Sequence, residues 1–219
     1  MPAAGPHLDA PSDCLPMIIY RIAHTGSRIV GRLLFRHRTL HRERIPEAGG
    51  ALIVANHVSY LDPAAVGASF RKPIYYLARK SLFKGFLGWL LPRIQVLPVD
   101  RGKGDLASMK RILSLLKEGH RVLIFPEGTR SMDGALQPAE AGIGFIIAKC
   151  DVPVVPVRIF GAFECFPRGS SWPRPGRITI VPGPPVDFSA VPPELTGRDR
   201  YQACADQVMK ALAELRLEA

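Results

Sequence analysis

The chain has 219 residues, a length that fits one domain with a large core. Its net charge of +10 favours polyanionic partners: nucleic acid, anionic lipid or phosphorylated metabolites. The four cysteines form no Cys-x-x-Cys motif and have no histidine at metal-ligand spacing, so no metal site is expected and free thiols in a reducing compartment are predicted. There is no run of eighteen uncharged apolar residues and no signal-peptide pattern at the start, so neither a spanning helix nor a leader is expected.

The first predicted element is an amphipathic helix over Leu15–Phe35. Its basic residues Arg21, His24, Arg28 and Arg32 recur at spacings of three and four, and the stretch of chain around them carries seven arginines and a single acid. In one reading the helix packs on the domain and its basic face is solvated. In the other, it lies in a membrane interface with its arginines at lipid phosphates. We expect the second for residues 15–43.

After this helix, short apolar runs alternate with helical patterns, which is typical of an α/β sheet with helices on its faces. The predicted strands are Ala51–Ala55, Pro73–Ala78, Ile94–Val99, Arg121–Phe125, Val154–Phe160 and Arg177–Val181. The predicted helices are Pro63–Phe70, Leu82–Leu91, Asp105–Glu118, Ala139–Lys149 and Glu194–Leu217. We therefore expect a single α/β domain over residues 44–219, with a mixed, largely parallel sheet flanked by helices, and a disordered N-terminus over residues 1–14.

The predicted helix Leu82–Leu91 is apolar nearly all round. A buried helix is one reading of this pattern. An exposed apolar patch with Trp89 at the lipid boundary is the alternative.

The first candidate site follows the strand Ala51–Ala55, where residues 56–63 read Asn-His-Val-Ser-Tyr-Leu-Asp-Pro. Asp62 and Pro63 predict a helix start with the aspartate as N-cap. His57 then lies at the carboxyl end of a strand, where open α/β sheets bind ligands. A carboxylate that orients the ring and stabilises the imidazolium would make His57 a general base, although a surface histidine beside a helix cap has the same pattern.

A second candidate site follows the strand Arg121–Phe125, where Glu127, Gly128, Thr129 and Arg130 stand in sequence. A glycine in such a turn lets the backbone approach a ligand, and arginine forms bidentate pairs with phosphate. Thr129 can donate a hydrogen bond. Glu127 is expected either to lock the arginine or to bond a substrate hydroxyl.

Two further arginines follow predicted strands, Arg101 with Gly102 after one and Arg79 after another. In a parallel sheet these strand ends converge, which would place a base beside a cationic phosphate clamp. That combination predicts transfer chemistry on a phosphorylated alcohol. Loops for nucleotides or dinucleotides and the Gly-x-Ser-x-Gly elbow are absent from the sequence, and Ser59 reads as a loop or capping hydroxyl rather than a nucleophile.

These motifs together resemble a known family. Residues 56–62 are similar to the His-x4-Asp signature of the glycerolipid acyltransferases, of which the bacterial 1-acylglycerol-3-phosphate acyltransferases are the nearest type. Residues 99–102 (Val-Asp-Arg-Gly), 125–131 (Phe-Pro-Glu-Gly-Thr-Arg-Ser) and 152–157 (Val-Pro-Val-Val-Pro-Val) resemble its further blocks, in the same order.

The resemblance implies a role for each matching residue. His57 would be the general base and Asp62 its orienting partner. The residues that would bind the acceptor's glycerol phosphate are Arg101, Glu127, Gly128 and Arg130, with Thr129 beside them and Arg79 standing where the family often has a lysine. One departure is Glu140, which reverses the charge of a lysine common after the third block and bears on acceptor identity.

The implied reaction is direct acyl transfer from acyl-CoA or acyl carrier protein, used as substrate, to the sn-2 hydroxyl of a lysophosphatidate, with no cofactor and no metal. The implied partners are the lysophospholipid and an anionic membrane surface, reached from the cytoplasmic face as a peripheral protein. Three alternatives remain open: transfer to another lysolipid, hydrolysis of a lipid or thioester by the same His/Asp pair, and a basic membrane-binding module without activity. Nucleic acid is not expected, because few aromatics interleave with the arginines.

Overall fold

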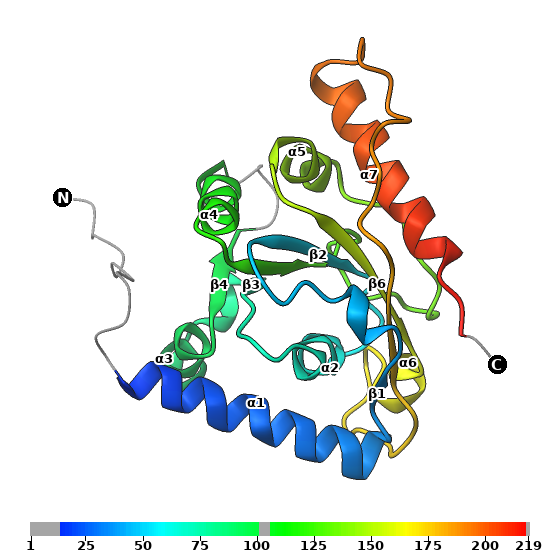
Figure 1. Cartoon of the computed structure of the whole chain (residues 1–219). Helices are drawn as coiled ribbons and strands as arrows, with labels where there is room; N and C mark the ends of the chain where they lie inside the picture. Colours follow the sequence, from blue (N-terminus) through cyan, green and yellow to red (C-terminus); the bar gives the residue numbers. More distant parts are fainter. Residues whose placement is uncertain (1–13, 101–105, 218–219) are drawn as a thin grey trace.

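The structure is a computed structural model that describes residues 14–100 and 106–217. The expected disorder of residues 1–14 lies outside the described residues, apart from Cys14, which begins the first helix. Figure 1 shows an α/β arrangement in which helices cover both faces of a central sheet, as the sequence predicted.

The sheet is mixed and largely parallel. Its main part has the strand order β1-β7-β6-β2-β5, in which only the β6–β7 pair is antiparallel, and β3 pairs with β4 in parallel. Backbone hydrogen bonds of 2.8 Å from Tyr75 to Arg121 and from Leu123 to Tyr75 join the two parts. The strands are β1 Arg38–Thr39, β2 Ala51–Ala55, β3 Tyr76–Arg79, β4 Val96–Val99, β5 Arg121–Ile124, β6 Val154–Phe160 and β7 Thr179–Pro182.

Seven α-helices and two short 3-10 helices accompany these strands in the described part of the chain. The α-helices are α1 Cys14–Phe35, α2 Asp62–Ser69, α3 Gly85–Arg93, α4 Leu106–Lys117, α5 Ala141–Lys149, α6 Ala162–Cys165 and α7 Gly197–Glu214. The 3-10 helices are η1 Arg42–Arg44 and η2 Lys80–Leu82. Every predicted helix is present, with ends that differ from the predictions by no more than three residues.

The core lies in two layers, one on each face of the sheet, because successive strand residues point to opposite sides. Ile53 and Ala55 of β2 face α1 and α2, while Leu52 and Val54 face α4, α5 and α7. All five residues of β2 are fully buried, so this central strand fixes the loop that follows it.

Helix α1 packs on α2 and on the sheet through one face only. Tyr20 and Phe35 are buried, and His24 turns inward to bond the Phe70 carbonyl at 2.9 Å. His24 therefore does not belong to the solvent-facing cationic stripe in which the sequence placed it. The opposite face of α1 exposes large apolar side chains, among them Ile18, Ile22, Ile29 and Leu33.

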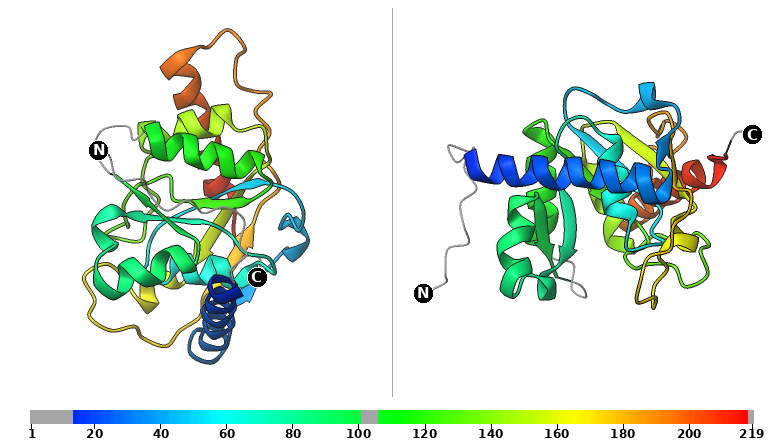
Figure 2. Two further views of the ribbon diagram at one scale, coloured as in Figure 1. Left: turned by 90° about the vertical axis from the view of Figure 1, so that its left-hand side faces the viewer. Right: turned by 90° about the horizontal axis from the view of Figure 1, so that it is seen from below.

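Helix α3 lies beside the N-terminal half of α1 (Figures 1 and 2). None of its residues is buried, and Phe86 and Trp89 are 70% and 46% exposed. Of the two readings of the apolar segment, the buried helix is therefore wrong and the exposed apolar patch is what the structure contains. No helix in the described ranges is both long and apolar enough to cross a bilayer.

Candidate active site

The loops after β2 and β5 meet at the carboxyl edge of the sheet, because these two strands are parallel neighbours. The backbone N–H of Ser131 donates to the His57 carbonyl at 2.8 Å, and the backbone N–H of His57 donates to the Glu127 carboxylate at 2.8 Å. The predicted convergence of the first and second candidate sites is present.

His57 and Asp62 form a hydrogen-bonded pair. The Nδ1–H of His57 donates to Oδ2 of Asp62 at 2.8 Å, and the same oxygen accepts the backbone N–H groups of Val58 and Ser59 at 2.7 Å each. Because a carboxylate only accepts, this arrangement places the neutral ring's proton on Nδ1 and leaves Nε2 as the basic atom. Nε2 has no hydrogen-bond partner among the described residues.

Asp62 is fully buried at the start of α2. Burial raises the pKa of Asp62, and the hydrogen bonds from His57, Ser59 and Val58 act in the opposite direction. The N-cap residue is Leu61, with Asp62 as the first helical residue, so the predicted N-cap assignment is wrong. The carboxylate instead turns back onto the loop, where its bonds to two backbone N–H groups hold the His57 loop in place.

Two neighbours fix the orientation of His57. The ring of Phe125 stacks on the imidazole with centroids 4.1 Å apart and planes 16° apart. The buried side chain of Asn56 donates to the Ile159 carbonyl at 3.1 Å and accepts the Ile159 N–H at 2.7 Å, which ties the end of β2 to β6. The Phe125 ring therefore holds one face of the imidazole, and the bonds between Asn56 and β6 hold the end of the strand from which His57 extends.

Glu127 is buried and does not pair with Arg130. One of its oxygens accepts the His57 N–H and the other accepts the Gln137 N–H at 3.1 Å. Burial raises the pKa of Glu127 to about 7, against the lowering effect of these two hydrogen bonds and of Arg158. Of its two predicted roles, locking the arginine is wrong, while contact with a substrate hydroxyl stays a prediction.

Arg130 stacks on Tyr60, three residues beyond His57. Its guanidinium carbon lies 3.6 Å from the centre of the Tyr60 ring, within cation–π range. The exposed Thr129 beside it accepts a hydrogen bond from Arg168 at 3.5 Å. The flat face of Tyr60 thus orients a cation next to the histidine, which keeps Arg130 available to an anionic group.

Gly128 has a positive φ of 62°, a conformation that favours glycine. A side chain at this position would collide with the carboxylate of Glu140, which lies against the turn. Glu140, at which this chain departs from the family that it resembles, therefore places a negative charge directly against the predicted phosphate-binding turn.

The two remaining predicted cations are placed less closely. Arg79 ends β3 at the same edge of the sheet and is exposed, with no interaction among the described residues that links it to His57 or Arg130. Arg101 lies outside the described residues. Their phosphate-binding roles stay predictions.

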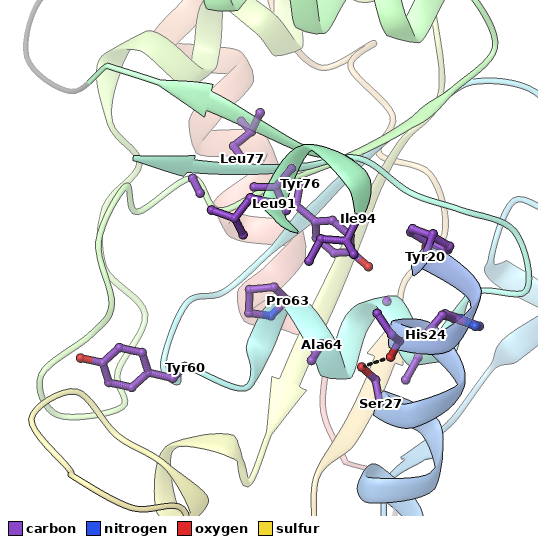
Figure 3. Close-up of a pocket in the computed structure, with 15 residues that line it drawn as sticks. Tyr20, His24, Ser27, Tyr60, Pro63, Ala64, Tyr76, Leu77, Leu91 and Ile94 are labelled. Atoms are coloured by element: carbon purple, nitrogen blue, oxygen red, sulfur yellow. Dashed lines mark hydrogen bonds between the residues drawn. The ribbon is translucent and has the colours of Figure 1, made fainter. Parts of the chain in front are cut away.

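An apolar pocket of about 280 Å³ opens beside this site, between α1, α2, α3 and the β3–β4 pair. Figure 3 shows Tyr60 at one end, Pro63 and Ala64 of α2 beyond it, and Tyr20 and His24 of α1 at the far side. Typical small-molecule pockets measure about 300–1,000 Å³, so the pocket is slightly smaller than these. Tyr60 lines this pocket and also carries the guanidinium of Arg130 on its ring.

Several site residues were not singled out by sequence reasoning. Asn56, Tyr60 and Phe125 stand within the quoted motifs, yet their contacts with β6, Arg130 and the His57 ring depend on three-dimensional packing. Gln137 acts through its backbone N–H, for which side-chain identity gives no signal. No group of three or more His, Cys, Asp or Glu residues able to hold a metal ion is present in the described ranges.

Comparison with known proteins places these features in a family. Residues 37–160, more than half of the chain, match the family model described as Acyltransferase. Proteins named 1-acyl-sn-glycerol-3-phosphate acyltransferase are similar to it: one from Bacillus subtilis is 27% identical over 90% of this chain and 96% of its own length. One from Chlamydomonas reinhardtii is 33% identical over 76% of this chain, and a chloroplastic one from Brassica napus is 34% identical over 58%.

The chain spans only 56% of the Chlamydomonas protein and 38% of the Brassica protein, so these relatives are considerably longer. Among solved structures, the crystal structure of the 1-acyl-sn-glycerophosphate (LPA) acyltransferase PlsC from Thermotoga maritima has a TM-score of 0.72. It matches over 96% of this chain and 86% of its own, at 21% identity, and therefore supports the fold alone. By its match to the family model, the chain belongs to the Acyltransferase family.

Proposed function

We propose that this protein transfers an acyl group from a thioester to the sn-2 hydroxyl of 1-acylglycerol-3-phosphate, giving phosphatidate. The observation that carries the proposal is the placement of Tyr60. Its ring carries the guanidinium of Arg130, the same residue lines the apolar pocket, and His57 stands three residues before it in the loop. A candidate base, a cation and an apolar pocket thus lie around the loop that carries Tyr60, which suits a substrate that combines a hydroxyl, a phosphate and a hydrocarbon chain.

In the proposed reaction, Nε2 of His57 accepts the proton of the sn-2 hydroxyl while Asp62 stabilises the imidazolium that forms. The oxygen attacks the thioester carbonyl carbon, and the C–S bond breaks. The departing sulfur takes the proton from the imidazolium, so His57 returns to its starting state. No covalent acyl-enzyme is needed, because positioning and base catalysis suffice for a good leaving group.

The donor is either acyl-CoA or acyl carrier protein. Both present the same thioester, and the apolar pocket is suited to hold the methylene chain that they share. The names of the relatives support lysophosphatidate as acceptor, whereas the carboxylate of Glu140 beside Gly128 disfavours a second negative charge there. Assaying both donors with an acceptor panel separates these possibilities.

We further propose that the protein works as a peripheral protein at a membrane surface, in keeping with the expected cytoplasmic face. The exposed apolar faces of α1 and α3 lie side by side, and the apolar pocket is walled by the same two helices. A lysolipid leaves a bilayer at a cost of about 0.8 kcal/mol per CH₂. An enzyme that rests on the bilayer would let the chain pass from lipid to pocket without crossing water.

Replacing His57 tests the reaction. His57→Ala is expected to lower kcat by about 10²–10⁴, the usual contribution of a general base, without unfolding the chain. His120→Ala is the matched control, because that exposed histidine lies before β5, at the opposite edge of the sheet. Product measured with and without acceptor separates transfer from hydrolysis. Turnover of His57→Ala at the wild-type rate, with lysophosphatidate as acceptor, would refute the proposal.

A further inference from the structure

A second cavity, of about 160 Å³, lies away from the His57 site. It is lined by Arg28, Arg32, His37, Arg38, Thr39, Arg42 and Ala68, and we call these residues the arginine pocket. They come from α1, the segment after it, β1, η1 and α2, so the chain brings together basic side chains from separate elements.

The positive charge of the arginine pocket is not balanced by carboxylates in the part of the chain that the structure describes. None of its four arginines forms an ion pair with an Asp or Glu within the described residues. Burial and the charges of Arg42, Arg28 and Arg32 lower the pKa of His37. Four cations that face one small cavity repel one another, and an anion bound there would relieve that repulsion.

Only some of these basic side chains make contacts that stabilise the fold. Arg42 donates to the Ser69 carbonyl at 2.9 Å and His37 bonds the Ala65 carbonyl at 3.0 Å, so both stabilise the carboxyl end of α2. Arg38 donates to Thr179 at 3.3 Å. Arg28 and Arg32 make no side-chain hydrogen bond within the described ranges, and Nε of Arg42 is buried without a partner. Arg28, Arg32 and Arg42 all line the cavity.

The arginine pocket is separate from the catalytic pair. Asp62 begins α2 and Ser69 ends it, and an eight-residue helix is about 12 Å long. The two sites therefore lie at opposite ends of the same helix. A group bound in the arginine pocket would not reach the Nε2 atom of His57.

We propose that the arginine pocket binds a phosphate group. Guanidinium groups pair with phosphate oxygens through parallel N–H bonds, and the cavity supplies several of them around one small volume. The phosphate could belong to a membrane lipid or to a soluble phosphate compound. The lipid source has a geometric basis, because Arg28 and Arg32 flank the exposed apolar face of α1 that includes Ile29 and Leu33.

The test compares two double variants with equal loss of charge. The pocket variant, Arg28→Gln/Arg32→Gln, removes the two arginines that α1 contributes to the pocket. The control variant, Arg21→Gln/Arg36→Gln, removes two exposed arginines of the same region that do not line it. Circular dichroism checks folding, and the single variant Arg32→Gln, at an exposed position, replaces the double variant if that one does not fold. The full chain is used throughout. Because these measurements follow binding rather than turnover, their outcome is independent of the proposed acyl transfer.

The first arm is calorimetry with inorganic phosphate, with chloride at equal ionic strength as the blank. Saturable binding to wild type is expected, weakened about tenfold or more in the pocket variant and kept in the control, since hydrogen bonds to charged groups are lost. Binding should also raise the pKa of His37, followed by NMR of the imidazole. A purely structural cluster would not show that response.

The second arm is sedimentation with phosphatidylcholine vesicles, alone or with phosphatidylglycerol. If the site takes lipid phosphate, the pocket variant loses more vesicle binding than the control, whether or not inorganic phosphate binds in solution. If the site takes soluble phosphate, the two variants differ only in the calorimeter. The proposal is overturned if wild type binds no phosphate saturably and both variants lose vesicle binding equally, or if phosphate binds both variants as it binds wild type.

Discussion

Asp62 concentrates three hydrogen bonds on one carboxylate oxygen, from one imidazole and two backbone N–H groups. The backbone bonds hold the loop over residues 57–59 in the shape that brings the ring back to the carboxylate. Its other oxygen is buried and has no hydrogen-bond partner among the residues that the structure describes. Asp62 therefore both orients the His57 ring and shapes the loop that carries it.

Arg130 is the described cation best placed for the acceptor phosphate. Arg130→Ala is expected to raise the apparent KM for lysophosphatidate by about ten- to a hundredfold with a smaller effect on kcat, as a charged hydrogen bond is worth about 1.5–3 kcal/mol. Arg130→Lys keeps the charge and loses the planar stack on Tyr60, so an intermediate KM is expected. Steady-state kinetics measure both, with a monoacylglycerol as the phosphate-free comparison. An equal KM increase for both acceptors would contradict the phosphate role.

Glu127 gives the stability of the fold a pH dependence. Its pKa is about 7 in the folded chain and its ordinary value is 4.5. Between these values the folded chain binds more protons than the unfolded chain, so stability from this group is present below about pH 4.5 and is lost as pH rises towards 7. The difference amounts to at most about 3 kcal/mol.

Urea unfolding at pH 5 and pH 8 measures this effect. Glu127→Gln cannot ionise, so its stability should change less between the two values than that of wild type. Glu164→Gln, at an exposed position, serves as the control and should keep the wild-type difference. Identical pH dependence in wild type and Glu127→Gln would show that the buried carboxyl does not titrate in this range.

The sequence predicted which residues meet at the site better than it predicted what they contact. His57 and Asp62 were paired correctly because the six residues between the end of β2 and the start of α2 leave little freedom. Of the two roles expected for Glu127, locking Arg130 is wrong, because its carboxylate bonds the backbone N–H of His57, seventy positions away. Long-range bonds to backbone N–H groups leave no side-chain pattern to read.

At the scale of the element, helix α2 contributes to the candidate active site, the arginine pocket and the apolar pocket. Its first residue is Asp62, its last residue bonds an arginine of the arginine pocket, and its middle lines the apolar pocket through Ala64 and Gly67. Gly67 is buried in the helix interior, where alanine would ordinarily stabilise. A side chain there would collide with the hydroxyl of Tyr76, so glycine is required by packing.

Gly67→Ala is therefore expected to destabilise the fold by about 1–3 kcal/mol, the usual cost of overpacking, despite the better helix propensity of alanine. Tyr76→Phe removes the hydroxyl in question, and the double variant should recover part of the loss. A double-mutant cycle in urea unfolding measures the coupling between the two positions. If Gly67→Ala stabilises the chain, or if the two effects add without coupling, the contact does not limit this position.

Element prediction was most successful for two strands inside the sheet. β2 and β6 have the predicted bounds, because their mainly apolar runs are typical of strands that have a neighbour on each side. β1 was missed, since two residues, an exposed Arg38 and a half-buried Thr39, contain no periodicity. The four-residue α6 was missed for the same reason, and η2 occupies the predicted start of α3.

At the scale of the whole molecule, the exposed apolar side chains and the basic side chains gather on neighbouring surfaces. The exposed side of α1 contributes Ile22 and Leu33, and α3 contributes Phe86 and Trp89. The arginine pocket begins on the flank of the same helix. The interface between water and an anionic bilayer has lipid phosphates at the boundary and hydrocarbon beneath them. On a membrane, the basic side chains of this surface would meet the phosphates, and its exposed apolar side chains would meet the hydrocarbon.

This arrangement predicts how the protein binds vesicles. Ile22→Ser/Leu33→Ser is expected to weaken partitioning by about tenfold or more per residue, since burying such a side chain contributes about 1.5–3 kcal/mol. Phe86→Ser/Trp89→Ser should act similarly if α3 also enters the lipid. The matched control is Leu106→Ser/Leu217→Ser, which removes two exposed leucines outside α1 and α3. Helix α4, which carries Leu106, lies across the sheet from α1 (Figure 1).

Sedimentation with phosphatidylglycerol vesicles at low and high salt separates the two contributions. Loss of the apolar residues should weaken binding at both salt concentrations, because hydrophobic contact is little screened. Loss of arginines should matter mainly at low salt. If the control variant binds vesicles as weakly as the α1 and α3 variants, the position of the exposed apolar residues does not matter. That result would contradict a membrane-facing surface formed by α1 and α3.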